Sequence, residues 1–211
     1  MTTLRRTNDT IIAEGPGSLR DLVLRNKDNL TGADLSGCDL SGLNLAGCNL
    51  SWSNLSDCDL SNCDLIGVTL SDSNLAGCDL RQANLAGCNL SGCDLSDSNL
   101  AGCDLRQANL AGCNLSDSNL AGSNLSDCDL SGLTLYDANL TGCDLRKANL
   151  AGCNLSGSNL TGCDLRQANL SGCNLSDCDL SDADFAGAKV NGAITAGAIG
   201  LRGFARKKAQ S

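Results

Sequence analysis

Hydrophobic positions recur at every fifth residue over most of the chain. Leucine occupies each fifth position from Leu30 to Leu180, and Phe185 and Val190 continue the series. A period of five fits neither the 3.6-residue repeat of an α-helix nor the two-residue alternation of a strand. A chain that turns a corner every five residues, however, points all of these side chains towards one axis. The pattern therefore predicts a solenoid over residues 30–190.

The positions around each leucine follow a second pattern. A small residue such as Ala33, Cys38 or Ser53 stands two places before the leucine, and Asp or Asn usually stands directly before it. We expect the small residue and the leucine to point inwards and the others outwards. The second residue after the leucine is mostly Gly, Asp or, once, Asn, as a corner with positive φ favours. Five residues depart from this rule: Trp52, Gln82, Gln107, Lys147 and Gln167. The last four follow an arginine, and there we expect a different type of turn.

Each repeat consists of a small residue, then Asp or Asn, then Leu and two further residues. It resembles the repeat of the pentapeptide-repeat family, whose consensus is A-D/N-L-x-x. The resemblance implies an all-β fold, a right-handed quadrilateral parallel β-helix in which four repeats make one coil. Residues 30–190 would then form about eight coils. With a spacing of about 4.8 Å between stacked strands, the rod would be roughly 38 Å long.

The N-terminal segment, residues 1–29, lacks the repeat. We expect it to be irregular up to residue 17, apart from one short strand at Thr10–Ala13. Ser18 followed three residues later by Asp21 is typical of a capping box and predicts a helix over Ser18–Lys27. Because an open end of a solenoid exposes leucines and unpaired strand edges, this helix is expected to cap the first coil.

The C-terminal segment, residues 191–211, leaves the repeat and is expected to cap the other end, with Phe204 among its apolar residues. It ends in a basic tail that includes residues 206–208. The chain has a formal charge of −9. Counted by segment, the charge is +1 for residues 1–29, −14 for 30–190 and +4 for 191–211. An acidic rod attracts basic protein surfaces and repels nucleic acid, so no direct binding of nucleic acid by the rod is expected.

All fifteen cysteines stand at the small inward position and alternate there with Ala and Ser. We expect buried free thiols, because parallel side chains on stacked coils hold their Cβ atoms slightly too far apart for an unstrained disulfide. A few disulfides or a soft-metal site remain alternatives. The chain has no histidine, so neither a zinc site nor the commonest general base is expected. We predict no cofactor and no enzymatic activity.

Reduced thiols are typical of cytoplasmic proteins. The chain also shows no signal peptide and no stretch of about 18 apolar residues that would cross a membrane. We therefore expect a cytoplasmic protein that does not associate with membranes.

The outward charges can be sorted by the four sides of the rod. We name the sides A, B, C and D after the leucines that begin them, Leu30, Leu35, Leu40 and Leu45. On side D, carboxylates such as Asp104 are followed by an arginine that neutralises them. The corner between sides B and C, here the B–C edge, lacks such arginines, and the lower part of side C is also expected to remain unneutralised. The acidic residues of the B–C edge are Asp57, Asp97, Asp117, Asp137 and Asp177.

Two aromatic residues, Trp52 and Tyr136, are expected to be exposed on neighbouring corners. Exposed aromatic side chains often anchor a protein partner. Together with the B–C edge they form the predicted partner-binding residues.

Three functions fit this surface. The first is a non-enzymatic scaffold that presents a rigid acidic rod to a protein with a basic surface. The second is a DNA mimic that inhibits a type II topoisomerase, because the chain resembles the quinolone-resistance members of the family, which present an acidic rod to DNA gyrase. The third is a structural subunit of a phage or another large assembly. Association of copies through a capped end or a neutral side is also considered.

Overall fold

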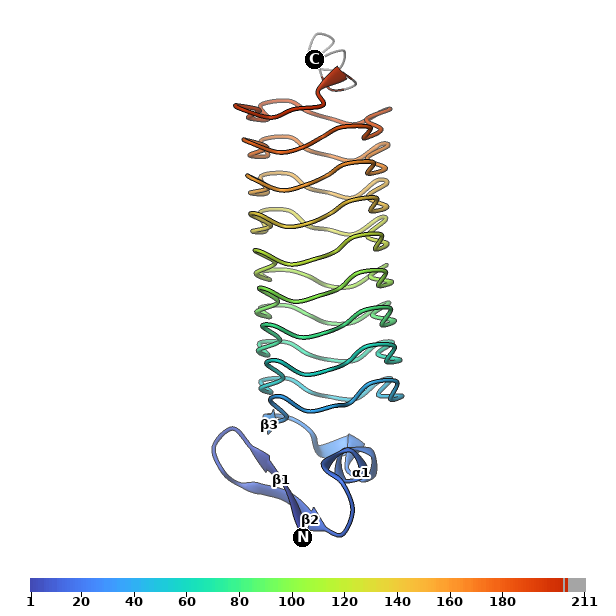
Figure 1. Cartoon of the computed structure of the whole chain (residues 1–211), viewed down its shortest axis with the longest axis vertical. Coiled ribbons are helices and arrows are strands. Elements are labelled where there is room, and N and C mark those ends of the chain that lie inside the picture. The colour runs from blue at the N-terminus through green and yellow to red at the C-terminus, as the bar shows by residue number, and fades with distance from the viewer. Residues whose placement is uncertain (203, 205–211) are drawn as a thin grey trace.

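A computed structural model describes residues 1–202 and 204. The chain forms a straight stack of coils, with a β-hairpin and a helix at its N-terminal end (Figure 1). The basic tail expected at residues 206–208 lies outside the described residues.

The coils are joined by parallel β-bridges between residues twenty positions apart. The series runs from Asp34 and Asn54 at the N-terminal end to Asp179 and Ile199 at the other end. Within each coil the backbone takes a positive φ at every fifth residue, so a coil has four corners. This agrees with the predicted solenoid of four repeats per coil.

The corners have the same conformation whatever residue occupies them. Gln82, Gln107 and Lys147 have φ values of 59°, 61° and 58°, close to those of the glycine corners. The expectation of a different turn after an arginine is therefore wrong. The reason lies in the neighbouring coil, because the Gln82 N–H donates to the Ala101 carbonyl at 3.0 Å and fixes the corner in place.

The core is a continuous column of leucines with small residues between them. Leu105 in the middle of the rod is fully buried. Its N–H donates to the Asn124 carbonyl of the next coil at 2.9 Å. Each fully buried leucine side chain contributes about 1.5–3 kcal/mol. Because each coil packs only on its neighbours, the stack is stabilised by many equal contacts.

The small inward residues carry a hydrogen bond that the sequence pattern did not reveal. The carbonyl of Leu35 accepts the Cys38 N–H across the corner at 3.1 Å, and it also accepts the Cys58 thiol of the next coil at 2.6 Å. Ser73 donates to Leu50 in the same way at 2.8 Å. Cysteine and serine therefore exchange freely here, since both donate to a corner carbonyl.

All fifteen cysteines are free thiols. Fourteen are buried, and burial raises the pKa of Cys88 and of Cys103 to about 12. The prediction of fifteen buried thiols is wrong for Cys38, which is partly exposed. Cys38 stands in the first coil, which no earlier coil covers, although the equivalent residues of that coil, Ala33, Leu43 and Cys48, are buried.

The N-terminal segment contains a β-hairpin. Strand β1 (Thr2–Arg6) pairs antiparallel with β2 (Ile11–Gly15) and, on its other side, with β3 (Ala33–Asp34) of the first coil. The expected single strand at Thr10–Ala13 is thus one half of a hairpin, and the expectation of an otherwise irregular start is wrong. Strand β1 lacks a clear alternation in sequence and forms because it has partners on both edges.

Helix α1 (Leu19–Arg25) is followed by the 3₁₀ turn η1 (Lys27–Asn29). The predicted capping box is confirmed: the Asp21 N–H donates to Ser18 Oγ at 3.1 Å, and the Ser18 N–H donates to Asp21 Oδ2 at 2.8 Å. The Ser18 N–H and the Ser18 hydroxyl, which also donates to Asp21 Oδ2 at 2.8 Å, lower the pKa of Asp21. Two residues of α1, Leu22 and Val23, are buried in the core cluster that continues into the coils.

At the C-terminal end the coil pattern continues to Gly200, ten residues further than predicted. Although Thr195 replaces the leucine, the Ile194 and Ile199 N–H groups still bond to the coil beneath, to Cys173 and Cys178 at 2.9 Å each. Backbone pairing with a complete coil thus compensates for the missing side chains.

The end of the stack is closed by an aromatic contact. The ring of Phe204 packs edge-on against Phe185 with 5.5 Å between centroids, as expected of a cap. Among the described residues no helix is both long and apolar enough to cross a membrane.

If the coils are stacked, a charge buried in a central coil should lower the stability of the protein more than a charge buried in a terminal coil. Leu105→Asp buries a carboxylate between two coils, whereas Val190→Asp affects a terminal coil that can fray. We expect Leu105→Asp to destabilise the protein by more than about 3 kcal/mol, because removal of a buried leucine side chain alone costs about 2–5 kcal/mol. Thermal unfolding followed by circular dichroism measures both variants. Equal losses would contradict the model of nearest-neighbour stacking.

Candidate interaction surface

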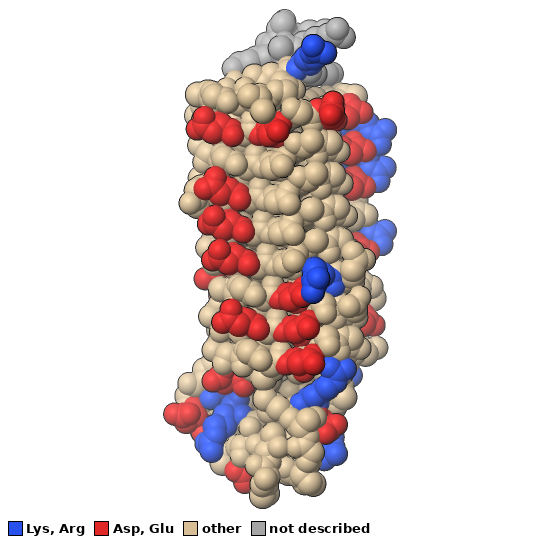
Figure 2. All heavy atoms as spheres, viewed as in Figure 1, with Lys and Arg blue, Asp and Glu red and all other residues tan. Residues whose placement is uncertain are grey.

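The five aspartates of the B–C edge form one column along the rod. All five are exposed and have positive φ, from 51° at Asp137 to 59° at Asp117. Backbone bonds hold successive corners above one another: the Asp97 N–H donates to Ser116, and the Asp117 N–H to Tyr136, at 3.1 and 2.9 Å. Figure 2 shows that acidic side chains gather in such columns parallel to the rod axis.

The carboxylates of this edge lean towards the following coil. A Cβ built on Gly77 would lie 2.5 Å from Oδ1 of Asp57, and one on Gly157 would lie even closer to Asp137. The glycines that interrupt the column therefore leave room for the carboxylate of the coil before. Within the described residues none of the five aspartates forms an ion pair, so their charge is not cancelled locally.

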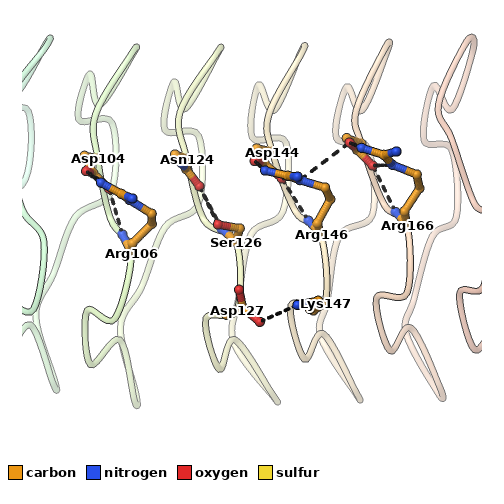
Figure 3. A network of polar contacts seen from close by, with 10 residues as sticks. Asp104, Arg106, Asn124, Ser126, Asp127, Asp144, Arg146, Lys147 and Arg166 are labelled. Atoms are coloured by element: carbon orange, nitrogen blue, oxygen red, sulfur yellow. Dashed lines mark hydrogen bonds and ion pairs between the residues drawn. The ribbon is translucent and has the colours of Figure 1, made fainter.

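Side D has the opposite arrangement, which Figure 3 shows from close by. Arg106 lies 2.5 Å from Asp104, and Arg146 lies 2.5 Å from Asp144 and 3.7 Å from Asp164. The hydrogen bond from Arg106 lowers the pKa of Asp104, and burial acts against it. The carboxylates are about half as exposed as the arginines, 25–29% against 48–57%. Side D is thus partly neutralised, as predicted, because guanidinium groups cover Asp104, Asp144 and Asp164.

The lower part of side C was also expected to remain unneutralised, and this expectation is wrong for two of its acids. Asp79 forms an ion pair with Arg81 at 2.5 Å, and Asp39 lies 3.8 Å from Arg20 of α1. The helix thus supplies a charge that the repeat pattern alone does not contain. The B–C edge is therefore the longest acidic column without arginine partners.

The Asp and Asn residues before each leucine have a structural role instead. Their Oδ1 atom accepts the backbone N–H two residues later, as Asp39 does from Ser41 at 3.0 Å. Asparagines also bond along the rod: Asn139 Nδ2 donates to Asn119 Oδ1 at 3.0 Å. This local bond stabilises the turn and explains why the position is mostly Asp or Asn, with exceptions such as Lys189. Aspartates at the corner itself accept no such bond.

The two exposed aromatic residues differ in their relation to the column. Tyr136 stands on the B–C edge, where the nearby charge of Asp117 and a hydrogen bond with Asp137 raise its pKa. Trp52 is 63% exposed and stands on the A–B corner with φ of 56°. The structure thus brings Tyr136 together with the predicted acidic residues and leaves Trp52 apart from them.

No catalytic centre emerges from the described residues. A shallow hollow of about 200 Å³ lies on the D–A corner and is lined by Arg146, Lys147, Arg166 and Gln167. Both arginines are already paired with carboxylates of side D. Among the described residues no three metal-ligating side chains come together.

Comparisons with known proteins agree with this picture. The family model for pentapeptide repeats matches the chain in eight copies, over segments that together run from residue 29 to 194. The search of curated proteins finds no match. Among solved structures, a trypsin-treated variant of QnrB1, a plasmid-mediated fluoroquinolone resistance protein, is 23% identical with a TM-score of 0.68 and covers 78% of this chain and 86% of its own.

Full-length QnrB1 is 19% identical with a TM-score of 0.61, covering 76% of this chain and 90% of its own. HetL, a pentapeptide repeat protein involved in heterocyst differentiation regulation in the cyanobacterium Nostoc, is 30% identical with a TM-score of 0.43 and covers 81% and 90%. The likeness to QnrB1 shows a common fold.

The conformation of Trp52 gives a prediction about its role. A residue with a side chain in the left-handed region costs roughly 1–2 kcal/mol, and glycine avoids this cost but loses about 0.5–1 kcal/mol through the unfolded state. Trp52→Gly should therefore leave the free energy of unfolding unchanged or slightly higher, whereas the β-branched Trp52→Val should lower it. Urea unfolding measures both. A clear loss of stability in Trp52→Gly would mean that the indole packs on the rod and is not available to a partner.

Proposed function

Because the chain belongs to the pentapeptide-repeat family, we propose that it is a non-enzymatic protein whose rod, a right-handed quadrilateral β-helix, binds a protein partner through the B–C edge. The observation that supports this proposal is the column of exposed, unpaired aspartates with Tyr136 beside it. The free thiols favour a cytoplasmic location.

The column offers a partner a continuous stripe of negative charge on a rigid support. Consecutive aspartates at Asp97, Asp117 and Asp137 are separated by one coil, about 4.8 Å, which is less than the screening length of about 8 Å at physiological salt. A basic groove therefore meets their summed field. Because the coils are already ordered, binding requires little loss of conformational freedom in the rod. Tyr136 adds a large apolar contact at the same place.

The proposal predicts that the central carboxylates carry the binding. In the triple variant Asp97→Asn, Asp117→Asn and Asp137→Asn the fold should persist, because asparagine also accepts positive φ. Capture of partner proteins by the immobilised rod should fall by at least about tenfold, and the remaining binding should depend less on salt. Quantitative capture at two salt concentrations measures both effects.

The matched control changes the same residue type at the same corner position on the other three corners. Asp72→Asn, Asp127→Asn and Asp182→Asn alter the net charge by the same amount, and all three residues are exposed with φ of 58–60°. If this control weakens binding as much as the B–C variant, overall charge decides and the edge is only a solvated surface.

A second candidate function is inhibition of a type II topoisomerase by mimicry of DNA. The shared fold with QnrB1, a fluoroquinolone resistance protein, favours it. Duplex DNA carries one charge per about 1.7 Å, so about 22 charges over 38 Å, and the predicted solenoid, residues 30–190, carries −14. DNA gyrase would then be the protein with the basic surface.

A supercoiling assay with purified gyrase separates this candidate from other partners. If the rod mimics DNA, it should slow supercoiling, and the triple B–C variant should do so several-fold less than the control variant. Normal supercoiling at a large molar excess of the wild-type rod would exclude gyrase while leaving a different protein partner open to the capture experiment.

A further inference from the structure

Cys38 differs from the other fourteen cysteines in exposure, and it lacks the thiol hydrogen bond to an earlier coil that most of them make. It is the one cysteine that is not buried. A typical thiol of the stack donates to a carbonyl 23 residues earlier, as Cys78 does to Leu55 at 2.8 Å. Cys38 instead makes only a long contact, 3.6 Å, with Ser36 of its own corner. Cys38 lies in the first coil, where its thiol has no carbonyl of an earlier coil to bond to, and it is partly exposed, so its sulfur is both reachable and loosely held.

The next coil places a second thiol directly against it. The backbone between the two coils is fixed by the bonds from Leu40 N–H to the Asp59 carbonyl at 2.8 Å and from Asp59 N–H to the Cys38 carbonyl at 3.0 Å. Cys58 therefore stacks on Cys38, while its own thiol donates to the Leu35 carbonyl at 2.6 Å. The neighbouring Cys58 thiol lowers the pKa of Cys38, against the opposing effects of burial and of Asp34. The thiolate, which is the reactive form of cysteine, is favoured at the exposed member of the pair.

We propose that Cys38 and Cys58 form a dithiol that hydrogen peroxide converts into a disulfide. The Cys38 thiolate attacks one peroxide oxygen, the O–O bond breaks, and the products are a sulfenic acid and hydroxide, which takes up a proton to give water. The Cys58 sulfur then attacks the sulfenic sulfur, the S–O bond breaks, and the leaving hydroxide takes the Cys58 proton as a second water. Two thiols and one peroxide thus give one disulfide and two waters.

The geometry of the stack allows this bond at the first coil. A coil spacing of about 4.8 Å lies within the range of Cα separations in disulfides, but parallel Cβ atoms must approach by a few tenths of an ångström. Cys38 can make this movement because its sulfur is not bonded to an earlier coil. Interior pairs such as Cys93 and Cys113 stack in the same way, but both are buried and each thiol donates to a carbonyl of the coil before. Peroxide cannot reach them.

The test exposes the folded, full-length protein to hydrogen peroxide, removes the peroxide with catalase, and then counts thiols by alkylation in denaturant and intact-mass measurement. The wild type should lose two of its fifteen thiols, with a mass decrease of two hydrogens that dithiothreitol reverses. Cys38→Ala should lose none. Cys58→Ala should stop at a sulfenic acid on Cys38 that dimedone traps. Alanine occupies equivalent buried positions, Ala83 and Ala138, so the fold should tolerate both changes.

Cys93→Ala is the matched control, because it removes one member of an interior stacked pair and should lose the same two thiols as the wild type. The oxidised wild type should also unfold at a higher temperature than the reduced protein, since the new bond joins the first two coils. The proposal is overturned if no thiols are lost, if Cys58→Ala loses two thiols, or if the wild type gains oxygen or forms a disulfide between two chains instead of losing two hydrogens.

Discussion

The structure depends on one backbone constraint: a left-handed corner at every fifth residue. From Gly32 to Gly197 the residue two places after each central leucine, or its replacement, has positive φ, whatever its side chain. Such a conformation is unfavourable for residues other than glycine. It is maintained because the corner N–H bonds to the next coil and the preceding leucine carbonyl receives both the turn N–H and a thiol or hydroxyl from the coil above. The leucine column and the straight rod follow from this repetition.

The same constraint divides the side chains into those that are needed for the fold of the rod and those that are available for contacts with other molecules. The leucine and the small residue fill the core, and the Asp or Asn between them accepts the turn N–H. Only the two corner residues have side chains without a required partner in the fold. Residues such as Asp117 and Tyr136 stand at those two positions. The fold of the coil does not require these residue types.

The sequence predicted the repeating coils, but it did not predict several features outside the repeat. The leucine period predicted the coils, and Ser18 with Asp21 predicted the helix start, because both signals are local. Strand β1 and the final coil escaped prediction because their stability comes from a neighbouring element and not from their own residues. The ion pair between Arg20 and Asp39 was missed for the same reason, since it joins the helix to a coil.

Within the candidate surface, the sequence alone placed the five aspartates on one edge, since residues twenty apart must align. It could not tell that Asp57 leans over Gly77 or that Tyr136 lies against Asp117 and Asp137, because these depend on side-chain direction.

Because one coil has twenty residues, the length of an insertion decides on which side of the rod all later side chains lie. Five additional residues, one repeat, would leave every leucine in the core but advance all later side chains by a quarter turn, so that the aspartates after that point would move to a neighbouring edge. Twenty additional residues would lengthen the rod by about 4.8 Å and keep every column intact. Length and surface pattern are therefore set independently, the first by whole coils and the second by the residues chosen at each corner.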